Sequence, residues 1–146
     1  MMKNTEESPF TLLNISPMFA IDESQLRSQY FTACRQFAEN KSMLQKIHES
    51  YRILLSPLSR LAELFAIFEQ PQPEANGMPS DSVLELFEQL SEEHLSSEQK
   101  DQLRKRVAEA TTLLCEEIQR KFEKNDWQRI RELRNDLVYY IKMRNF

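Results

Sequence analysis

Few side chains in this sequence could perform chemistry, and none recurs at the spacing that a reaction or a metal ion requires. The two histidines, His48 and His94, have no cysteine or carboxylate at metal-ligand spacing. Adjacent carboxylates at 92–93 and 116–117 lie in helical patterns, whereas acid–base catalysis needs a cleft that shifts their pKa values. We therefore expect no enzyme, no bound metal ion and no cofactor.

The composition excludes several other classes of protein. A single glycine argues against phosphate-cradling loops and against a β fold with many tight turns. The formal net charge of −4 disfavours a general nucleic-acid binder. There is no run of about 18 apolar residues to span a membrane, and no secretory signal pattern at the start. We expect a cytoplasmic protein without nucleic-acid or membrane partners.

Cys34 and Cys115 are far apart in the sequence, and each lies within a helical pattern. Two cysteines can form one bridge, but two buried free thiols agree better with a reducing compartment. We expect free, buried thiols, and their role stays open.

The stretch at residues 47–68 connects the N-terminal part of the chain to the part that follows. Apolar residues recur at helical spacing on both sides of Ser56 and Pro57. Proline has no N–H and disfavours the α conformation in the residue before it, so the first helix should end there. Proline also suits the first position of a new helix, for which Ser56 can serve as the N-cap. The pattern predicts two helices set end to end.

The residues before this stretch predict a helical hairpin. Asp22 followed by Gln25 resembles a capping box, and the helix that it opens should fade near residues 38–40. A second helix from about residue 41 to residue 55 follows after a short connection. The apolar cluster at 10–15 is the natural lid over the facing stripes of the two helices.

Residues 70–79 mark a domain boundary, because they contain three of the six prolines and the only glycine. Cap signals then open three amphipathic helices, at Ser80 or Asp81, at Ser96 with Gln99, and at Asn125–Asp126. Three such helices with short loops predict an antiparallel bundle. We therefore expect an all-α protein with an N-terminal domain at 1–69, a Pro-rich joint at 70–79 and a three-helix bundle at 80–146.

The same segments carry a resemblance to a known family. PFTLLNIS at 9–16, FAIDESQLRSQYFTACRQF at 19–37 and HESYRILLSPLSRLAELF at 48–65 resemble the first three helices of a J domain. VLELFEQL at 83–90 and WQRIRELRNDL at 127–137 are similar to the C-terminal domain of HscB-type co-chaperones of iron–sulphur cluster assembly. The resemblance covers essentially the whole chain. It implies a J-domain-like helical hairpin joined to a C-terminal three-helix bundle.

The resemblance also implies a chaperone contact that this sequence alters. J domains carry His-Pro-Asp between their second and third helices, where it contacts the ATPase of a heat-shock chaperone (HscA or DnaK type) and promotes hydrolysis. The matching positions here are Ala38, Glu39 and Asn40, followed by Lys41. The imidazole and the proline are gone, and the acid has moved by one position. We therefore expect a degenerate chaperone-contact loop that does not stimulate the ATPase.

The second implied partner is the scaffold protein on which clusters are built (IscU type). In the HscB type, an apolar and acidic face of the first C-terminal helix binds this scaffold. The positions that align are Val83, Leu84, Phe87 and Glu88, with Ser91 or Glu92 as a further candidate. An aromatic residue of the last helix aligns with Asn135. We expect Val83, Leu84 and Phe87 to be exposed, while Leu86 and Leu90 pack inward.

The charge of this segment agrees with a binding surface. Residues 81–98 contain six acidic side chains and no lysine or arginine. An exposed apolar patch with a charged rim is typical of protein-binding surfaces. Two alternatives stay open: all five apolar residues belong to the core, or the helix at 83–90 binds a second copy in a structural assembly protein.

Overall fold

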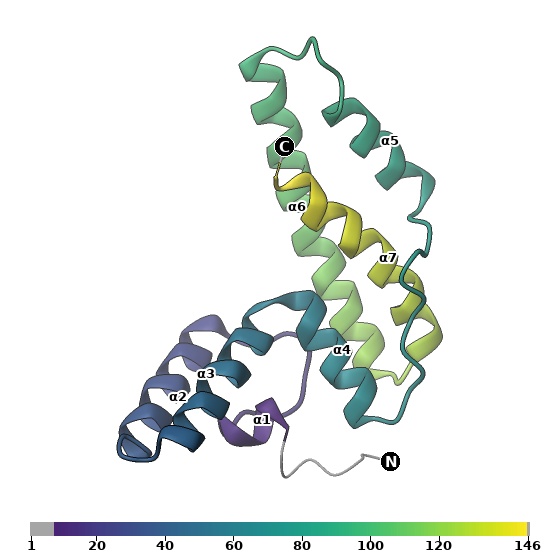
Figure 1. Cartoon of the computed structure of the whole chain (residues 1–146). Coiled ribbons are helices and arrows are strands. Elements are labelled where there is room, and N and C mark those ends of the chain that lie inside the picture. Colours follow the sequence, from purple (N-terminus) through teal and green to yellow (C-terminus); the bar gives the residue numbers. More distant parts are fainter. Residues whose placement is uncertain (1–7, 146) are drawn as a thin grey trace. The chain divides into compact units, whose positions relative to one another are not determined.

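The computed structural model describes residues 8–145, and every regular element among them is a helix (Figure 1). The helices are α1 (Pro9–Leu12), α2 (Glu23–Gln36), α3 (Lys41–Leu55), α4 (Pro57–Ile67), α5 (Asp81–Leu90), α6 (Ser97–Glu123) and α7 (Trp127–Met143). The prediction of an all-α fold is confirmed. The chain divides between Gln72 and Pro73 into two compact units, the N-terminal and the C-terminal unit. The finer limits, with a joint over 70–79, stay a prediction.

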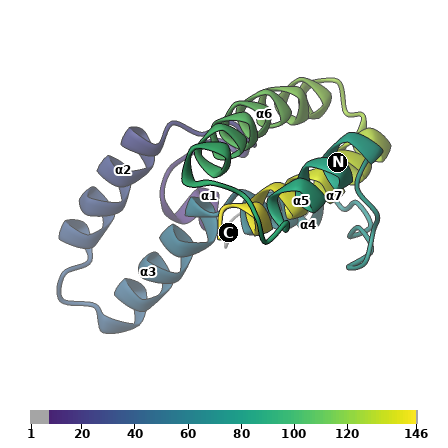
Figure 2. The same cartoon turned by 90° about the horizontal axis from the view of Figure 1, so that it is seen from above.

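Helices α2 and α3 form the hairpin that the sequence predicted (Figure 2). The Asp22 carboxylate accepts a 2.8 Å hydrogen bond from the Ser24 N–H at the start of α2. Four residues, 37–40, connect the helices before α3 begins at Lys41. Leu26 is 1% exposed and Ile47 is fully buried between the two helices and their neighbours. The facing apolar stripes therefore meet as their spacing required.

Helix α1 packs against α3 and closes the hairpin. Phe10, Leu13 and Ile15 are all buried. The Ser8 side chain accepts a 3.2 Å hydrogen bond from the Thr11 N–H and so caps this single turn. The predicted lid over the hairpin is confirmed.

The passage from α3 to α4 lies at Ser56 and Pro57, as predicted. Ser56 is extended, with φ −89° and ψ 126°, and Pro57 is the first residue of α4. The hydroxyl of Ser56 makes no capping hydrogen bond. Instead, the Ser59 hydroxyl donates to the carbonyl of Ile53 at 2.5 Å. Ser56 therefore occupies the N-cap position as predicted, while the side-chain hydrogen bond at this passage comes from Ser59.

A buried arginine fixes this passage, and the sequence analysis did not identify it. Arg60 is only 9% exposed, and its Nη1 donates a 2.7 Å hydrogen bond to the carbonyl of Leu54 in the last turn of α3. Its guanidinium carbon lies 5.1 Å from the centroid of the Phe19 ring. Because the last carbonyls of a helix have no partner within the helix, this bond satisfies one of them. Arg60 thereby joins α3, α4 and the segment before α2.

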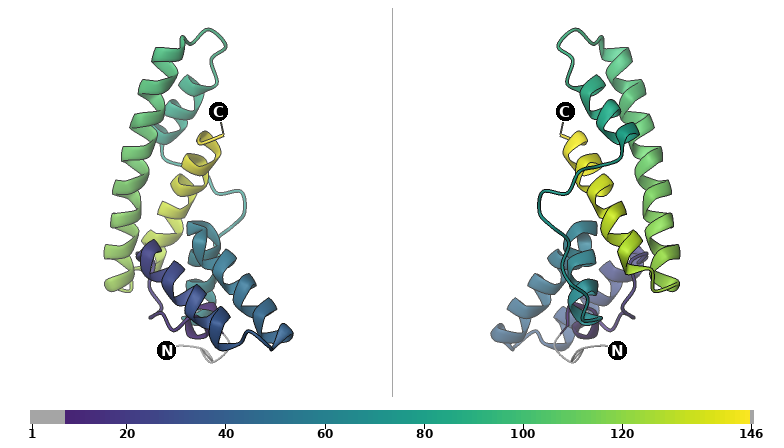
Figure 3. Two further views of the ribbon diagram at one scale, coloured as in Figure 1. Left: turned by 90° about the vertical axis from the view of Figure 1, so that its left-hand side faces the viewer. Right: turned by 90° about the vertical axis from the view of Figure 1, so that its right-hand side faces the viewer.

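The C-terminal unit contains three helices, and α6 is the longest at 27 residues. Figure 3 shows α5 and α7 lying along α6. Ser96 and Gln99 form the predicted capping box, with the Gln99 N–H donating to the Ser96 hydroxyl at 3.1 Å and the Ser96 N–H to the Gln99 side chain at 2.9 Å. Asp126 caps α7 by accepting from the Arg129 N–H at 3.2 Å. The local start signals of α6 and α7 are therefore confirmed.

The two cysteines form no disulfide bond. Cys34 and Cys115 are free thiols, but they are half-buried and not fully buried as expected. Within residues 8–145, no helix is long and apolar enough to cross a membrane.

Replacing Arg60 tests its role at the passage. We expect Arg60→Met to lower amide-exchange protection at the end of α3 by about 1–3 kcal/mol, because the Leu54 carbonyl loses its partner in a buried place. The matched control is Arg52→Met. The Arg52 side chain is 76% exposed and pairs with Glu49 on the same helix, so its loss should cost less than about 1 kcal/mol. Equal protection in the two variants would contradict the role of Arg60.

Candidate functional site

Helix α5 turns one face into the core of the C-terminal unit. Val83, Leu86 and Leu90 are 2%, 7% and 5% exposed, and they form a cluster with Val107 of α6 and Met143 of α7. The expectation that Val83 is exposed is therefore wrong. Val83 lies on the same side of the helix as Leu86 and Leu90 because residues three and four apart share a face. Val83 anchors α5 and cannot belong to an exposed surface.

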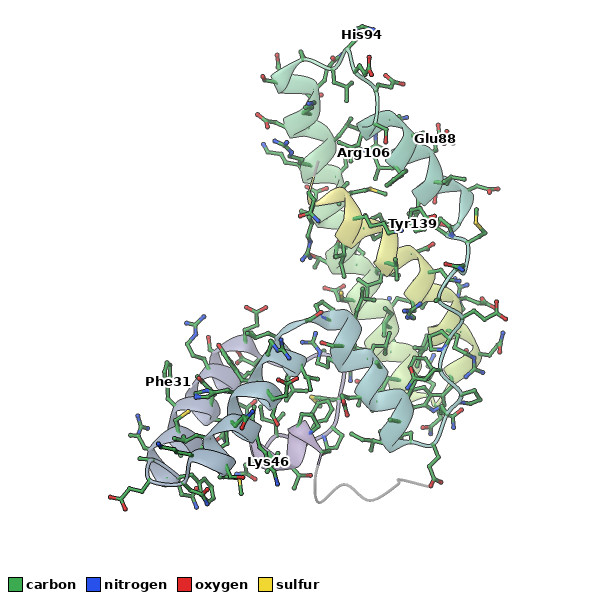
Figure 4. The ribbon with its side chains drawn as sticks, in the orientation of Figure 1. Phe31, Lys46, Glu88, His94, Arg106 and Tyr139 are labelled. Carbon is green, nitrogen blue, oxygen red and sulfur yellow. The ribbon has the colours of Figure 1, made fainter. Side chains whose placement is uncertain are left out.

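The neighbouring strip of α5 stays accessible. Leu84 and Phe87 are half-buried and not fully exposed as expected, and Phe87 packs against the core cluster. Glu88 is exposed and points away from α6 and α7 in Figure 4. Glu92 is also exposed, but it follows Ser91, the C-cap residue of α5. The structure thus brings Leu84, Phe87 and Glu88 together, while Glu92 lies at the edge of this strip.

An aromatic residue of α7 completes the strip, and it is Tyr139. The Phe87 and Tyr139 rings meet edge to face, with centroids 5.3 Å apart and planes at 73°. The Lys142 ammonium lies 4.8 Å from the centroid of the Tyr139 ring. We call Leu84, Phe87, Glu88, Tyr139 and Lys142 the docking surface. The sequence predicted Asn135 at this place, one helical turn before Tyr139. Tyr139 could have been found from the sequence, because it is an aromatic residue four positions after Asn135 and therefore on the same face of the helix.

Asn135 has another contact, with the chain's only glycine. A methyl group at the Cα of Gly77 would collide with the Asn135 side chain, since it would lie 2.5 Å from Cγ and 2.6 Å from Nδ2. A side chain at position 77 would therefore force the Asn135 side chain to move. Asn135 holds the segment before α5 and is not part of the docking surface.

The residues on either side of Asn135 bind the same segment. Arg134 donates to the carbonyl of Glu74 at 3.4 Å. One carboxylate oxygen of Asp136 accepts the N–H of Ser80 at 2.7 Å, and the other accepts its hydroxyl at 3.2 Å. Ser80 is the N-cap residue of α5 but makes no capping bond through its own side chain. Asp136 therefore determines where α5 begins relative to α7.

Asp136 also influences a neighbouring tyrosine. Burial, and then the charge of Asp136, raise the pKa of the Tyr140 hydroxyl above its ordinary value. Both effects disfavour the phenolate. Tyr140, which packs against the α5 core cluster, is therefore neutral at physiological pH and presents no added charge there.

The residues of the predicted chaperone-contact loop lie together between α2 and α3. Ala38, Glu39, Asn40 and Lys41 are all exposed. The Asn40 side chain accepts a 3.1 Å hydrogen bond from the Met43 N–H, so it serves as the N-cap of α3. Because this amide is engaged in capping, it is a poor substitute for a free carboxylate in the loop.

One groove of the N-terminal unit contains a carboxyl group with a shifted pKa. Its volume is about 980 Å³, and it lies between α1, α3 and α4. Burial raises the pKa of the Glu63 carboxyl at its edge. Catalysis by carboxyl groups needs a second titratable group with a different pKa, and Glu49 of this groove forms a 2.5 Å ion pair with Arg52. Among residues 8–145, no three His, Cys, Asp or Glu side chains are placed to hold a metal ion.

The helix order defines the class of fold: an all-α chain with a J-domain-like unit followed by a three-helix bundle. Two solved structures identify it further. The crystal structure of human co-chaperone protein HscB has a TM-score of 0.81 and 18% identity, and the match covers 99% of this chain and 82% of that chain. Chaperone HscB from Vibrio cholerae has a TM-score of 0.76 and 18% identity, over 94% and 93% of the two chains.

This chain therefore has the fold of the HscB co-chaperones, and the predicted fold is confirmed. The sequence matches no family model, and no curated protein matches it. The likeness lies in the arrangement of helices more than in the identity of side chains. The residues of the docking surface must therefore be judged on their own geometry.

The contact between Gly77 and Asn135 gives a test by double substitution. We expect Gly77→Ala to destabilise the C-terminal unit by about 1–3 kcal/mol because the added methyl group overpacks against Asn135. Asn135→Ala should remove most of this cost in the double variant, since the colliding atoms are gone. Urea unfolding can be followed by the fluorescence of Trp127, the only tryptophan, which lies in this unit.

The neighbouring substitution Asn76→Ala serves as the control, because Asn76 is exposed. It should change the free energy of unfolding by less than about 0.5 kcal/mol. Additive costs of Gly77→Ala and Asn135→Ala would contradict the proposed contact.

Proposed function

We propose that this protein is an HscB-like co-chaperone or adaptor that binds an iron–sulphur cluster scaffold protein through its docking surface. The fold of the chain agrees with this role. The observation that supports it most is the division of α5 into a buried face and an accessible one. Leu86 and Leu90 hold the helix in the core, while Leu84 and Phe87 are half-buried beside the exposed Glu88, with Phe87 also in contact with the core cluster.

The docking surface has the properties of a protein-binding patch. The edge-to-face contact with Tyr139 fixes the Phe87 ring, so little side-chain entropy is lost when a partner covers it. The acidic rim of α5 favours a partner with basic side chains around an apolar centre. A scaffold protein that presents such a patch would be guided to α5 by charge and held there by apolar contact.

The N-terminal unit carries the loop that corresponds to the chaperone contact of J domains. Its loop at 38–41 has lost His-Pro-Asp, and Asn40 is engaged as a helix cap. We infer that this unit supports the fold or makes a weakened contact with a heat-shock chaperone, without stimulating its ATPase. The protein would then act in the cytoplasm as a binding partner and not as an enzyme.

Truncation of the docking surface tests the proposed partner. We expect Leu84→Ala combined with Phe87→Ala to weaken binding of the scaffold protein by about 2–4 kcal/mol, because two apolar anchors are lost. Isothermal titration calorimetry with the cognate scaffold measures this change. Tyr139→Ala should weaken binding as well, and Asn135→Ala should have a smaller effect than Tyr139→Ala.

The matched control is Leu113→Ala on α6, where the leucine is 64% exposed and outside the docking surface. It should leave binding unchanged. Val83→Ala should instead lower the free energy of unfolding, roughly by 1–3 kcal/mol, since Val83 is buried. Unchanged affinity in the Leu84 and Phe87 double variant would exclude the proposed surface.

A steady-state ATPase assay with the cognate chaperone tests the loop. We expect no rise in the ATPase rate at saturating protein, whereas a J protein that carries His-Pro-Asp should raise it in the same assay. Stimulation that disappears on Glu39→Ala would overturn this expectation. Asn40→Ser, which keeps the helix cap, and Asn40→Ala, which removes it, separate a direct contact of Asn40 from a loss of helix stability.

A further inference from the structure

The N-terminal unit exposes an aromatic side chain that its own core does not use. Phe31 is 50% exposed and lies on the outer side of α2 (Figure 4). Its ring centroid is 5.3 Å from that of Tyr30, and Tyr30 stacks on Tyr51 of α3 at 4.1 Å. The Tyr30 hydroxyl lies 2.6 Å from Nδ1 of His48. The exposed ring therefore packs on one side against Tyr30, which is itself held by Tyr51 and His48.

A small hollow lies beside this base on α3. Its volume is about 400 Å³, and it is lined by Lys41, Leu44, Gln45, His48, Glu49 and Arg52. His48 belongs both to the hollow and to the contact with Tyr30. An exposed ring and an apolar-based hollow are thus neighbours on one side of the hairpin.

The hairpin has the opposite charge to the rest of the molecule. Residues 23–55 contain five lysines or arginines and three glutamates, a net charge of +2 in a chain of −4. Arg27 and Arg35 lie one turn before and one turn after Phe31, and both are exposed. Lys41 and Arg52 line the hollow. We call Arg27, Phe31, Lys41, His48 and Arg52 the hairpin face.

The C-terminal unit carries the complementary surface. Residues 81–98 hold six acidic side chains and no basic one. The docking surface also presents accessible apolar side chains, Leu84 and Phe87, beside the exposed Glu88. Apart from Lys142 over the Tyr139 ring, the charged residues around the apolar centre of the docking surface are acidic, and they correspond to the cationic rim around the aromatic centre of the hairpin face. Such complementarity guides association and selects the partner.

We propose that the docking surface of one copy of this protein binds the hairpin face of a second copy. The two patches differ, so the contact is heterologous, and it either closes into a ring or adds further copies. The interaction needs no scaffold protein. Since it uses the docking surface, self-association and binding of a client at that surface should exclude one another.

Sedimentation velocity of the full-length protein without any client tests this proposal. At low salt, over about 10 µM to 1 mM, the weight-average mass of the wild type should rise with concentration. Screening by about 0.5 M salt should return it to the monomer mass. Two double variants then reverse the charge of the two surfaces. Arg27→Glu with Lys41→Glu changes the hairpin face, and Glu88→Lys with Glu85→Lys changes the docking surface and its acidic neighbour on α5.

Each variant alone should associate at least about tenfold more weakly than the wild type, because like charges then face one another. An equimolar mixture of the two should associate again, since the reversed hairpin face meets the reversed docking surface. Controls of equal charge change on α6 and its C-cap, Lys105→Glu with Lys124→Glu and Glu109→Lys with Glu116→Lys, should behave as the wild type. All of these residues are exposed, and circular dichroism verifies that the variants fold.

Three results would overturn the proposal: a wild type that stays monomeric throughout, reversal variants that associate as the wild type does, or a mixture that stays monomeric. These outcomes are distinct from a failure of scaffold binding, because no client is present. If the protein both self-associates and binds the scaffold protein at the docking surface, addition of the scaffold should lower the mass of the self-associated species toward that of a one-to-one complex.

Discussion

The hold of α7 on the start of α5 is the constraint on which the candidate site depends. Asp136 accepts two hydrogen bonds from Ser80, and the Asn135 side chain packs closely against the backbone of Gly77. Together they fix the rotation of α5 about its own axis. That rotation buries Val83 and leaves Leu84 half-buried, because side chains one residue apart point about 100° apart on a helix. Phe87 lies at the border of the buried face, where it packs against the core cluster and is also half-buried.

The local features of this chain could be predicted from sequence because their causes are local. Pro57 separates α3 from α4, Ser96 and Gln99 form a capping box, and Asp126 opens α7. Each signal acts through hydrogen bonds within three or four residues. The stripes of the hairpin were equally readable, since their spacing decides which face is apolar.

The details of the site could not be predicted in the same way. Five apolar residues on a ten-residue helix leave several rotations possible, and only the neighbours in space choose between them. Tyr139 and Asn135 are one turn apart on α7. An alignment shifted by one turn therefore selects Asn135, which contacts Gly77, in place of Tyr139, whose ring contacts Phe87. Arg60 was missed because an arginine in an apolar pattern is normally exposed, and its burial depends on a carbonyl at the end of another helix.

The most direct test of the account is a map of the scaffold contact on this protein by nuclear magnetic resonance. Amide and side-chain signals are followed while unlabelled scaffold protein is added. The account predicts that the largest changes fall on Leu84, Phe87 and Tyr139, with small changes at Ala38–Lys41. Changes concentrated on the hairpin, with an unaffected α5, would contradict it.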